Sequence, residues 1–106
     1  MNIINLTPHS ITIIAEDGTK TEFAPSGVVA RVAQIREQVG TLNGFPLYRN
    51  SFGEVVGLPE TKTDTVYIVS ALVAQAAKDR DDLVIVDNTI RDENGRIIGA
   101  RGFARV

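Results

Sequence analysis

The stretch TVYIVSALVAQAAKDRDDLVIV, residues 65–86, decides the expected fold. Its first five residues form an apolar run that is typical of a strand. Ser70 favours the start of a helix, and alanine occupies four of the next eight positions. A polar break at 79–82 then precedes a second apolar run at 83–86. The pattern predicts a strand–helix–strand unit whose two strands are parallel.

Hairpin signals lie on both sides of this unit. Asp17-Gly18, Asn43-Gly44 and Asn94-Gly95 each separate two segments with strand character, which is a strong short-range sign of a β-hairpin. Around them we expect strands at 2–6, 10–16, 19–24, 45–49, 54–58, 89–91 and 96–98. A turn is expected at 50–53, a polar loop at 59–64 and an added outer strand at 100–106.

Residues 28–39 are ambiguous on their own. Their β-branched residues favour a strand, whereas 34–38 could form a helical turn. We favour the strand. The whole pattern indicates one α+β domain spanning 1–106, with a mostly antiparallel or small barrel-like sheet and one strand–helix–strand unit near 65–86.

Composition excludes several chemistries. The chain has no cysteine, which removes disulfides, thiolate metal sites and thiol nucleophiles. Its net charge of −2 argues against general nucleic-acid binding. There is no cofactor fingerprint, so we expect no cofactor and no metal. We find no signal-peptide pattern and no apolar run long enough to span a membrane, and we expect a cytoplasmic protein.

The predicted unit also suggests where an anion could bind. Ligands of parallel α/β units bind beyond the carboxyl ends of the strands, and here those ends are Ser70 and Asp87. Arg91 follows closely, and Arg101 lies between two glycines. Arginine is well shaped for phosphate. These residues could equally be a helix cap, a turn and solvated surface charges.

Three further residues are ligand candidates. His9 is the only histidine and follows Pro8 in a break between strands. Tyr48-Arg49 ends a short predicted strand and could stack on a nucleobase. Each has a simpler interpretation as a loop histidine or a partly buried aromatic. No catalytic residue can be named from spacing alone, so we lean away from an enzyme.

Several motifs together resemble a family of small proteins encoded by bacteriophages and prophages. They are Asn5–His9, Tyr48-Arg49 with Gly53–Pro59, Tyr67–Ser70 and Arg91–Gly95. The resemblance covers nearly the whole chain and implies a phage origin, but no activity. Small phage proteins are often counter-defence factors, and some of them sequester nucleotide signals made by the host.

These observations leave three functions open. The first is capture of a nucleotide-like, phosphate-bearing signal by His9, Tyr48, Arg49, Ser70, Asp87, Arg91 and Arg101, in a homo-oligomer that builds the pocket between subunits. The second is a protein-interaction factor that inhibits a host enzyme through a sheet edge or an apolar patch. The third is a small nucleotide hydrolase using His9 with Asp87 or Glu54.

Overall fold

The computed structural model describes all residues, 1–106, and contains the strand–helix–strand unit predicted at 65–86. Strands β6 (Thr65–Ile68) and β7 (Leu83–Arg91) run parallel and are joined through α1 (Ala71–Ala76). The Ser70 hydroxyl accepts a hydrogen bond from the Val73 N–H at 3.3 Å, so Ser70 caps α1 as expected. The α+β fold class is confirmed.

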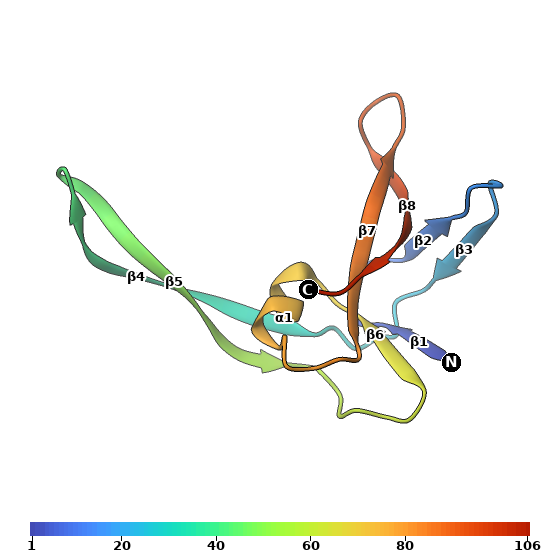
Figure 1. Cartoon of the computed structure of the whole chain (residues 1–106), viewed down its shortest axis with the longest axis horizontal. Helices are drawn as coiled ribbons and strands as arrows, with labels where there is room; N and C mark the ends of the chain where they lie inside the picture. Colours follow the sequence, from blue (N-terminus) through green and yellow to red (C-terminus); the bar gives the residue numbers. More distant parts are fainter.

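A six-stranded mixed sheet surrounds this unit, in the order β1-β6-β7-β8-β2-β3 (Figure 1). The other strands are β1 (Asn2–Asn5), β2 (Ile11–Ile14), β3 (Lys20–Phe23) and β8 (Ile97–Ala104). β1 pairs parallel to β6, and β2 pairs parallel to β8. The hairpins β2–β3 and β7–β8 are antiparallel, as the Asp17-Gly18 and Asn94-Gly95 signals predicted.

The two edges of this sheet approach each other. Asn5 at the end of β1 forms a parallel bridge with Pro25, which lies just beyond β3. The Ser26 N–H also donates to the Asn5 carbonyl oxygen at 3.0 Å. The sheet therefore curls, and the loop after β3 covers part of the β1 edge.

The core lies between the curled sheet and α1. Its buried members are Leu6, Ala30, Tyr67, Val69, Val73, Ala74, Ala77 and Leu83. Tyr67 is the largest fully buried side chain, with 0% exposed. Its hydroxyl donates to the Glu60 carbonyl oxygen at 3.2 Å, which satisfies the one polar atom of the ring.

The longest strands stand outside the sheet. Strands β4 (Arg31–Leu42) and β5 (Phe45–Val56) pair only with each other and form an antiparallel hairpin, which we call the arm. Asn43 and Gly44 connect them with φ of 50° and 82°, the two positive values that a type I′ turn requires. The strand favoured for 28–39 is confirmed from Arg31 onward and continues to Leu42, whereas 28–30 lie outside it.

The turn predicted at 50–53 is wrong, because β5 continues through it. The register passes from Val55 opposite Val32 to Phe52 opposite Gln34. Two residues of β5, at 53 and 54, therefore face one residue of β4, which is the pattern of a β-bulge. The glycine that suggested a turn accommodates this irregularity instead.

The C-terminal prediction also needs correction. β7 continues to Arg91 rather than ending at Val86, because residues 85–91 pair with β8. β8 is one strand from Ile97 to Ala104 and lies between β7 and β2, so no separate outer strand forms at 100–106. No helix is long and apolar enough to cross a membrane, since α1 has only six residues.

Candidate functional site: the β4–β5 arm

The arm projects from the rest of the molecule (Figure 1). The radius of gyration is 16.8 Å and the extents are 54 × 39 × 21 Å. A compact chain of this length would have a radius of gyration of about 13 Å. The excess indicates that a substantial part of the chain lies outside the folded body.

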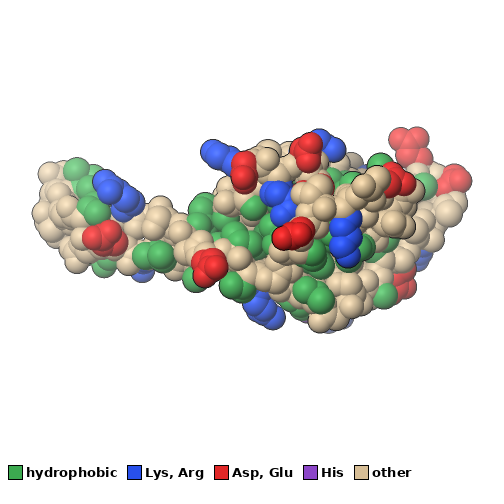
Figure 2. All heavy atoms as spheres, turned by 90° about the horizontal axis from the view of Figure 1, so that it is seen from below, with side chains coloured by type: hydrophobic (Ala, Val, Ile, Leu, Met, Phe, Trp, Pro, Cys, Tyr) green, Lys and Arg blue, Asp and Glu red, His purple; other side chains and the backbone are tan.

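Apolar side chains are exposed along this arm and at its tip, as well as on the body (Figure 2). Fourteen large hydrophobic residues of the chain are exposed, and eight of them belong to the arm: Ile35, Val39, Leu42, Phe45, Leu47, Tyr48, Phe52 and Val56. Isolated exposed apolar residues are ordinary, but their concentration on one projecting element is typical of a binding surface.

The register gathers three of these residues at the end of the arm. Leu42 lies opposite Phe45, and Leu47 lies opposite Gly40. Since side chains alternate along a strand, Phe45 and Leu47 point to the same face, and Leu42 shares it across the hairpin. We call Leu42, Phe45 and Leu47 the tip cluster. Leu42 and Phe45 are 64% and 72% exposed, so neither is covered by its own chain.

Polar contacts stiffen the middle of the arm. The Arg36 guanidinium stacks over the Tyr48 ring at 3.7 Å from the ring centroid, a cation–π contact. Glu37 lies opposite Arg49 in the register, which brings unlike charges together on the other face. These side chains link the two strands in the middle of the arm.

The root of the arm is anchored in the core. Ala30 is buried, and Val32, Val55 and Leu58 pack against the core cluster. Gly57 has φ of 78°, and a side chain there would collide with the Val29 carbonyl. The root is thus part of the folded body, while residues 33–52 are exposed throughout. A lone two-stranded hairpin is only marginally stable in water, so its free part gains from a partner.

Both long edges of the arm are also open. β4 and β5 form a two-stranded sheet with no third strand, so each leaves a row of backbone N–H and carbonyl groups unpaired by strands. The two edge strands of the main sheet, β1 and β3, have only four residues each. Part of the β1 edge is covered by the loop after β3, and β3 carries Lys20 and Glu22, which protect it from pairing. The arm is therefore the element best suited to contact another chain.

The structure separates the predicted ligand residues into different places. Tyr48 and Arg49 lie on the arm, where Arg36 already occupies the Tyr48 ring. Ser70 caps α1. Asp87 was predicted to follow the end of its strand. It lies instead inside β7, opposite Gly102.

The two predicted tail arginines make internal contacts. The Arg91 guanidinium donates to the Gly95 carbonyl oxygen at 2.8 Å and so closes its own hairpin. Arg101 donates to the carbonyl oxygens of Ile14 and Ala15 at 3.1 and 2.9 Å, tying β8 to the end of β2. Both are therefore engaged within the chain.

The segment around His9 is held by Asn5. The Asn5 amide donates to the carbonyl oxygens of His9 and Phe23 at 2.7 and 2.9 Å. Its side-chain oxygen accepts from the backbone N–H and the hydroxyl of Thr7. Asn5 is only 2% exposed, and every polar atom of this buried amide has a hydrogen-bond partner. The part of His9 used here is its carbonyl.

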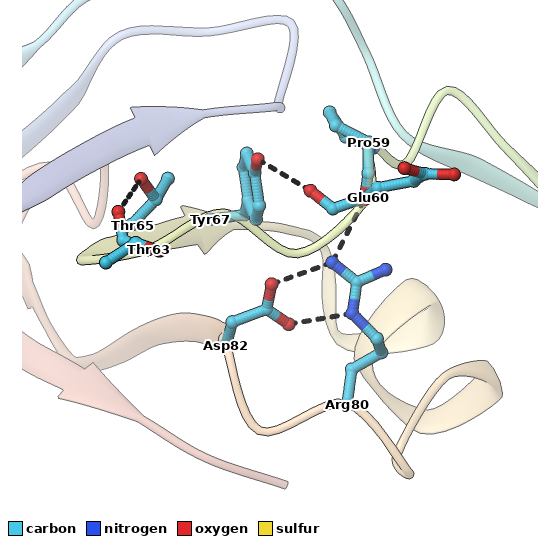
Figure 3. A network of polar contacts seen from close by, with 7 residues as sticks. All are labelled: Pro59, Glu60, Thr63, Thr65, Tyr67, Arg80 and Asp82. Carbon is cyan, nitrogen blue, oxygen red and sulfur yellow. Dashed lines mark hydrogen bonds and ion pairs between the residues drawn. The ribbon is translucent and has the colours of Figure 1, made fainter.

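A second polar network, which the sequence did not point out, closes the loop before β6 (Figure 3). Arg80 donates two hydrogen bonds to the Asp82 carboxylate, at 2.8 and 2.7 Å, and a third to the Pro59 carbonyl oxygen at 3.0 Å. These hydrogen bonds from Arg80 hold the pKa of the buried Asp82 below its ordinary value. The network joins the 59–64 loop to the start of β7 and has a structural role.

One hollow in the body is apolar. It lies where β2, β7 and β8 adjoin, and measures about 140 Å³. Its apolar lining includes Ile11, Val86, Ile97 and Ile98, and Ser10, Thr12 and Thr89 supply polar atoms. This volume is well below the ~300–1,000 Å³ of typical small-molecule sites. A second hollow, of about 220 Å³, is lined by Lys78, Arg80 and Arg105 together with Asp79 and Asp81, so its charges are mixed.

Comparison with known proteins gives no further guide to the site. Neither protein-family models, nor curated proteins, nor solved structures produced a significant match to this chain.

Proposed function

We propose that this chain is a protein-binding factor that holds its partner with the β4–β5 arm. The observation that carries the proposal is the tip cluster of Leu42, Phe45 and Leu47, exposed at the end of a hairpin that pairs with nothing else. Apolar and aromatic anchors of this kind dominate the energetics of protein interfaces. Among the functions left open by the sequence, this is the protein-interaction factor.

The arm has the two properties that such a function needs. Its root is fixed in the core by Val32 and Val55, so a partner bound to the arm is joined to the folded body. Its outer part makes no contact that the body needs in order to fold. Covering it therefore costs little rearrangement, and the covered apolar area contributes to binding.

Site-specific photo-crosslinking tests the proposal. A photoreactive phenylalanine analogue replaces Phe45, and a matched variant carries it at Lys62, an exposed residue of the 59–64 loop that belongs neither to the arm nor to the lining of the apolar hollow. Each variant is expressed in cells and irradiated. We expect a discrete protein adduct from position 45 and none from position 62. Equal adducts at both positions, or none at position 45, would overturn the proposal.

Nucleotide capture has less support in a single chain, because its predicted residues lie on the arm, at the cap of α1, within β7 and β8, and in the loop after β1. A site shared between copies remains a testable form of that prediction. Thermal melting against nucleotides, cyclic dinucleotides and ADP-ribose derivatives addresses it, since a ligand of the folded state raises the midpoint. The arm proposal expects a flat panel; a shift lost in Arg91→Ala or Arg101→Ala would favour capture.

A further inference from the structure

The geometry points to a second copy of this chain as the protein that covers the tip cluster: we propose a reciprocal dimer in which Phe45 of each copy enters the apolar hollow of the other. This inference rests on the proposed function, because it names the partner of the same arm.

The hollow and the tip match in size and chemistry. The hollow measures about 140 Å³ and has Ile11, Val86, Ile97 and Ile98 in its lining. An apolar cavity of about 150 Å³ is large enough for a benzene ring. The Phe45 ring is of this size and is the most exposed aromatic side chain of the chain, at 72%. Ile97 and Ile98 are 57% and 48% exposed, so the hollow also presents uncovered apolar surface.

The two surfaces belong to different parts of one chain. The arm extends away from the body on the opposite side from the β2, β7 and β8 strands that form the hollow (Figure 1). Its strands are 12 residues long, roughly 40 Å at about 3.3 Å per residue. The tip of the arm lies far from the hollow of its own chain, so the contact has to form between chains (Figure 1).

Symmetry allows both contacts at once. A two-fold axis through the midpoint between the tip and the hollow of one chain exchanges these two positions. The tip of each copy then meets the hollow of the other copy. The assembly closes at two copies, and both tips and both hollows are covered. The same contact made only once per pair would leave one tip and one hollow free to recruit further chains.

Charge does not select this contact. Residues 31–56 hold Arg31, Arg36 and Arg49 against Glu37 and Glu54, a net charge of +1. The strands that form the hollow, β2, β7 and β8, hold Arg91 and Arg101 against Asp87, which is also +1. Recognition between the tip and the hollow therefore rests on their apolar side chains.

Sedimentation equilibrium of the purified chain tests the assembly. We expect twice the 11.5 kDa chain mass for the wild type. Phe45→Ser should weaken self-association by at least about 30-fold, as for a central aromatic anchor. Ile97→Gln, on the opposite surface, should also weaken it, whereas Val106→Ser, at another exposed apolar residue, should not. A wild type that remains monomeric at about 1 mM, a high protein concentration, would overturn the dimer.

Cross-linking between chains tests the arrangement. Because the chain has no cysteine, only the introduced thiols can react. Thr41→Cys places a thiol near the tip, and Ser10→Cys places one in the lining of the hollow. The two variants are mixed and treated with a short bismaleimide reagent. We expect a heterodimer of these two, which disappears when Phe45→Ser is added to the Thr41→Cys chain. Thr21→Cys on β3 is the control for Ser10→Cys and should give none.

The outcomes separate this inference from the proposed function. A monomeric chain whose position 45 forms an adduct with a different protein in cells would overturn the dimer and keep the proposed function. A dimer that cross-links equally through the Thr21→Cys control would overturn the seating of the tip in the hollow. The absence of any adduct at the arm, together with a monomeric chain, would overturn both.

Discussion

Leu42 and Phe45 face each other across the last rung of the β4–β5 hairpin, and both remain more than half exposed. Cross-strand apolar pairs normally contribute to the core face of a sheet. Here the pair sits at the far end of an element whose root alone is packed. It can contribute to function without contributing to the folding of the body.

This separation predicts that Phe45→Ser leaves stability almost unchanged. A substitution at an exposed site away from the core shifts the free energy of unfolding by no more than about 0.5 kcal/mol. Tyr67→Ala, in the buried core, should cost about 3–5 kcal/mol by comparison with other large aromatic truncations. Urea unfolding of the dilute monomer measures both. A large loss of stability in Phe45→Ser would show that the tip is part of the fold.

The Asn5 network predicts a strong effect at the N-terminal motif. Asn5→Ala leaves the carbonyl oxygens of His9 and Phe23 without the donor that now satisfies them, so we expect a loss of about 1–3 kcal/mol in unfolding free energy. Asn2→Ala, at the exposed start of the same strand, is the matched control and should change little. His9→Ala should also be mild, because the network uses the His9 backbone. Equal losses for all three would contradict this assignment.

Gly57 at the arm root gives a third prediction. Its φ is 78°, and an added Cβ would collide with the Val29 carbonyl. Gly95 has a similar φ of 81° but open space around it. Gly95→Ala therefore measures the conformational cost alone, about 1–2 kcal/mol, and Gly57→Ala should exceed it. Thermal melts of the two variants provide the comparison, and equal losses would mean that the root relaxes freely.

Asp82 gives a pH-dependent prediction. Hydrogen bonds from Arg80 lower the pKa of Asp82 in the folded state, while the unfolded value is about 3.9. The stabilisation is therefore present above that pH and is lost as the pH falls through the folded pKa. Asp82→Asn should cost about 1.5–3 kcal/mol at neutral pH. Its difference from the wild type should shrink toward pH 2. The exposed neighbour variant Asp81→Asn should show no comparable trend; a difference independent of pH would exclude the ion pair as its source.

Local signals in the sequence were sufficient for most of the fold. The Asp17-Gly18, Asn43-Gly44 and Asn94-Gly95 turns and the Ser70 cap are decided by neighbouring residues, and all four are present. The bulge at residues 53 and 54 was missed because Asn50, Ser51 and Gly53 within four residues favour a turn, and only the pairing of this segment with β4 shows otherwise. The position of β8 inside the sheet depends on β2, which is more than eighty residues earlier.

The candidate site was harder to predict for the same reason. The apolar residues of the arm look like ordinary strand residues, and no local pattern distinguishes a strand that reaches the core from one that leaves it. One signal was available: the segment favoured as a strand at 28–39, before Asn43-Gly44, is the longest strand expected in the chain, although the turn predicted at 50–53 divided its partner. The polar residues chosen instead, such as Arg91 and Arg101, proved to bind backbone carbonyls of their own chain.

Hydrogen exchange along the arm tests the central claim most directly. In dilute protein, backbone amides of 35–52 should exchange much faster than those of β6 and β7, because nothing covers the outer hairpin. At high concentration, or with a partner identified by cross-linking at position 45, the same amides should become protected, and Phe45→Ser should prevent this protection. An arm that exchanges as slowly as β6 in the dilute monomer, or that stays unprotected in every complex, would contradict the account.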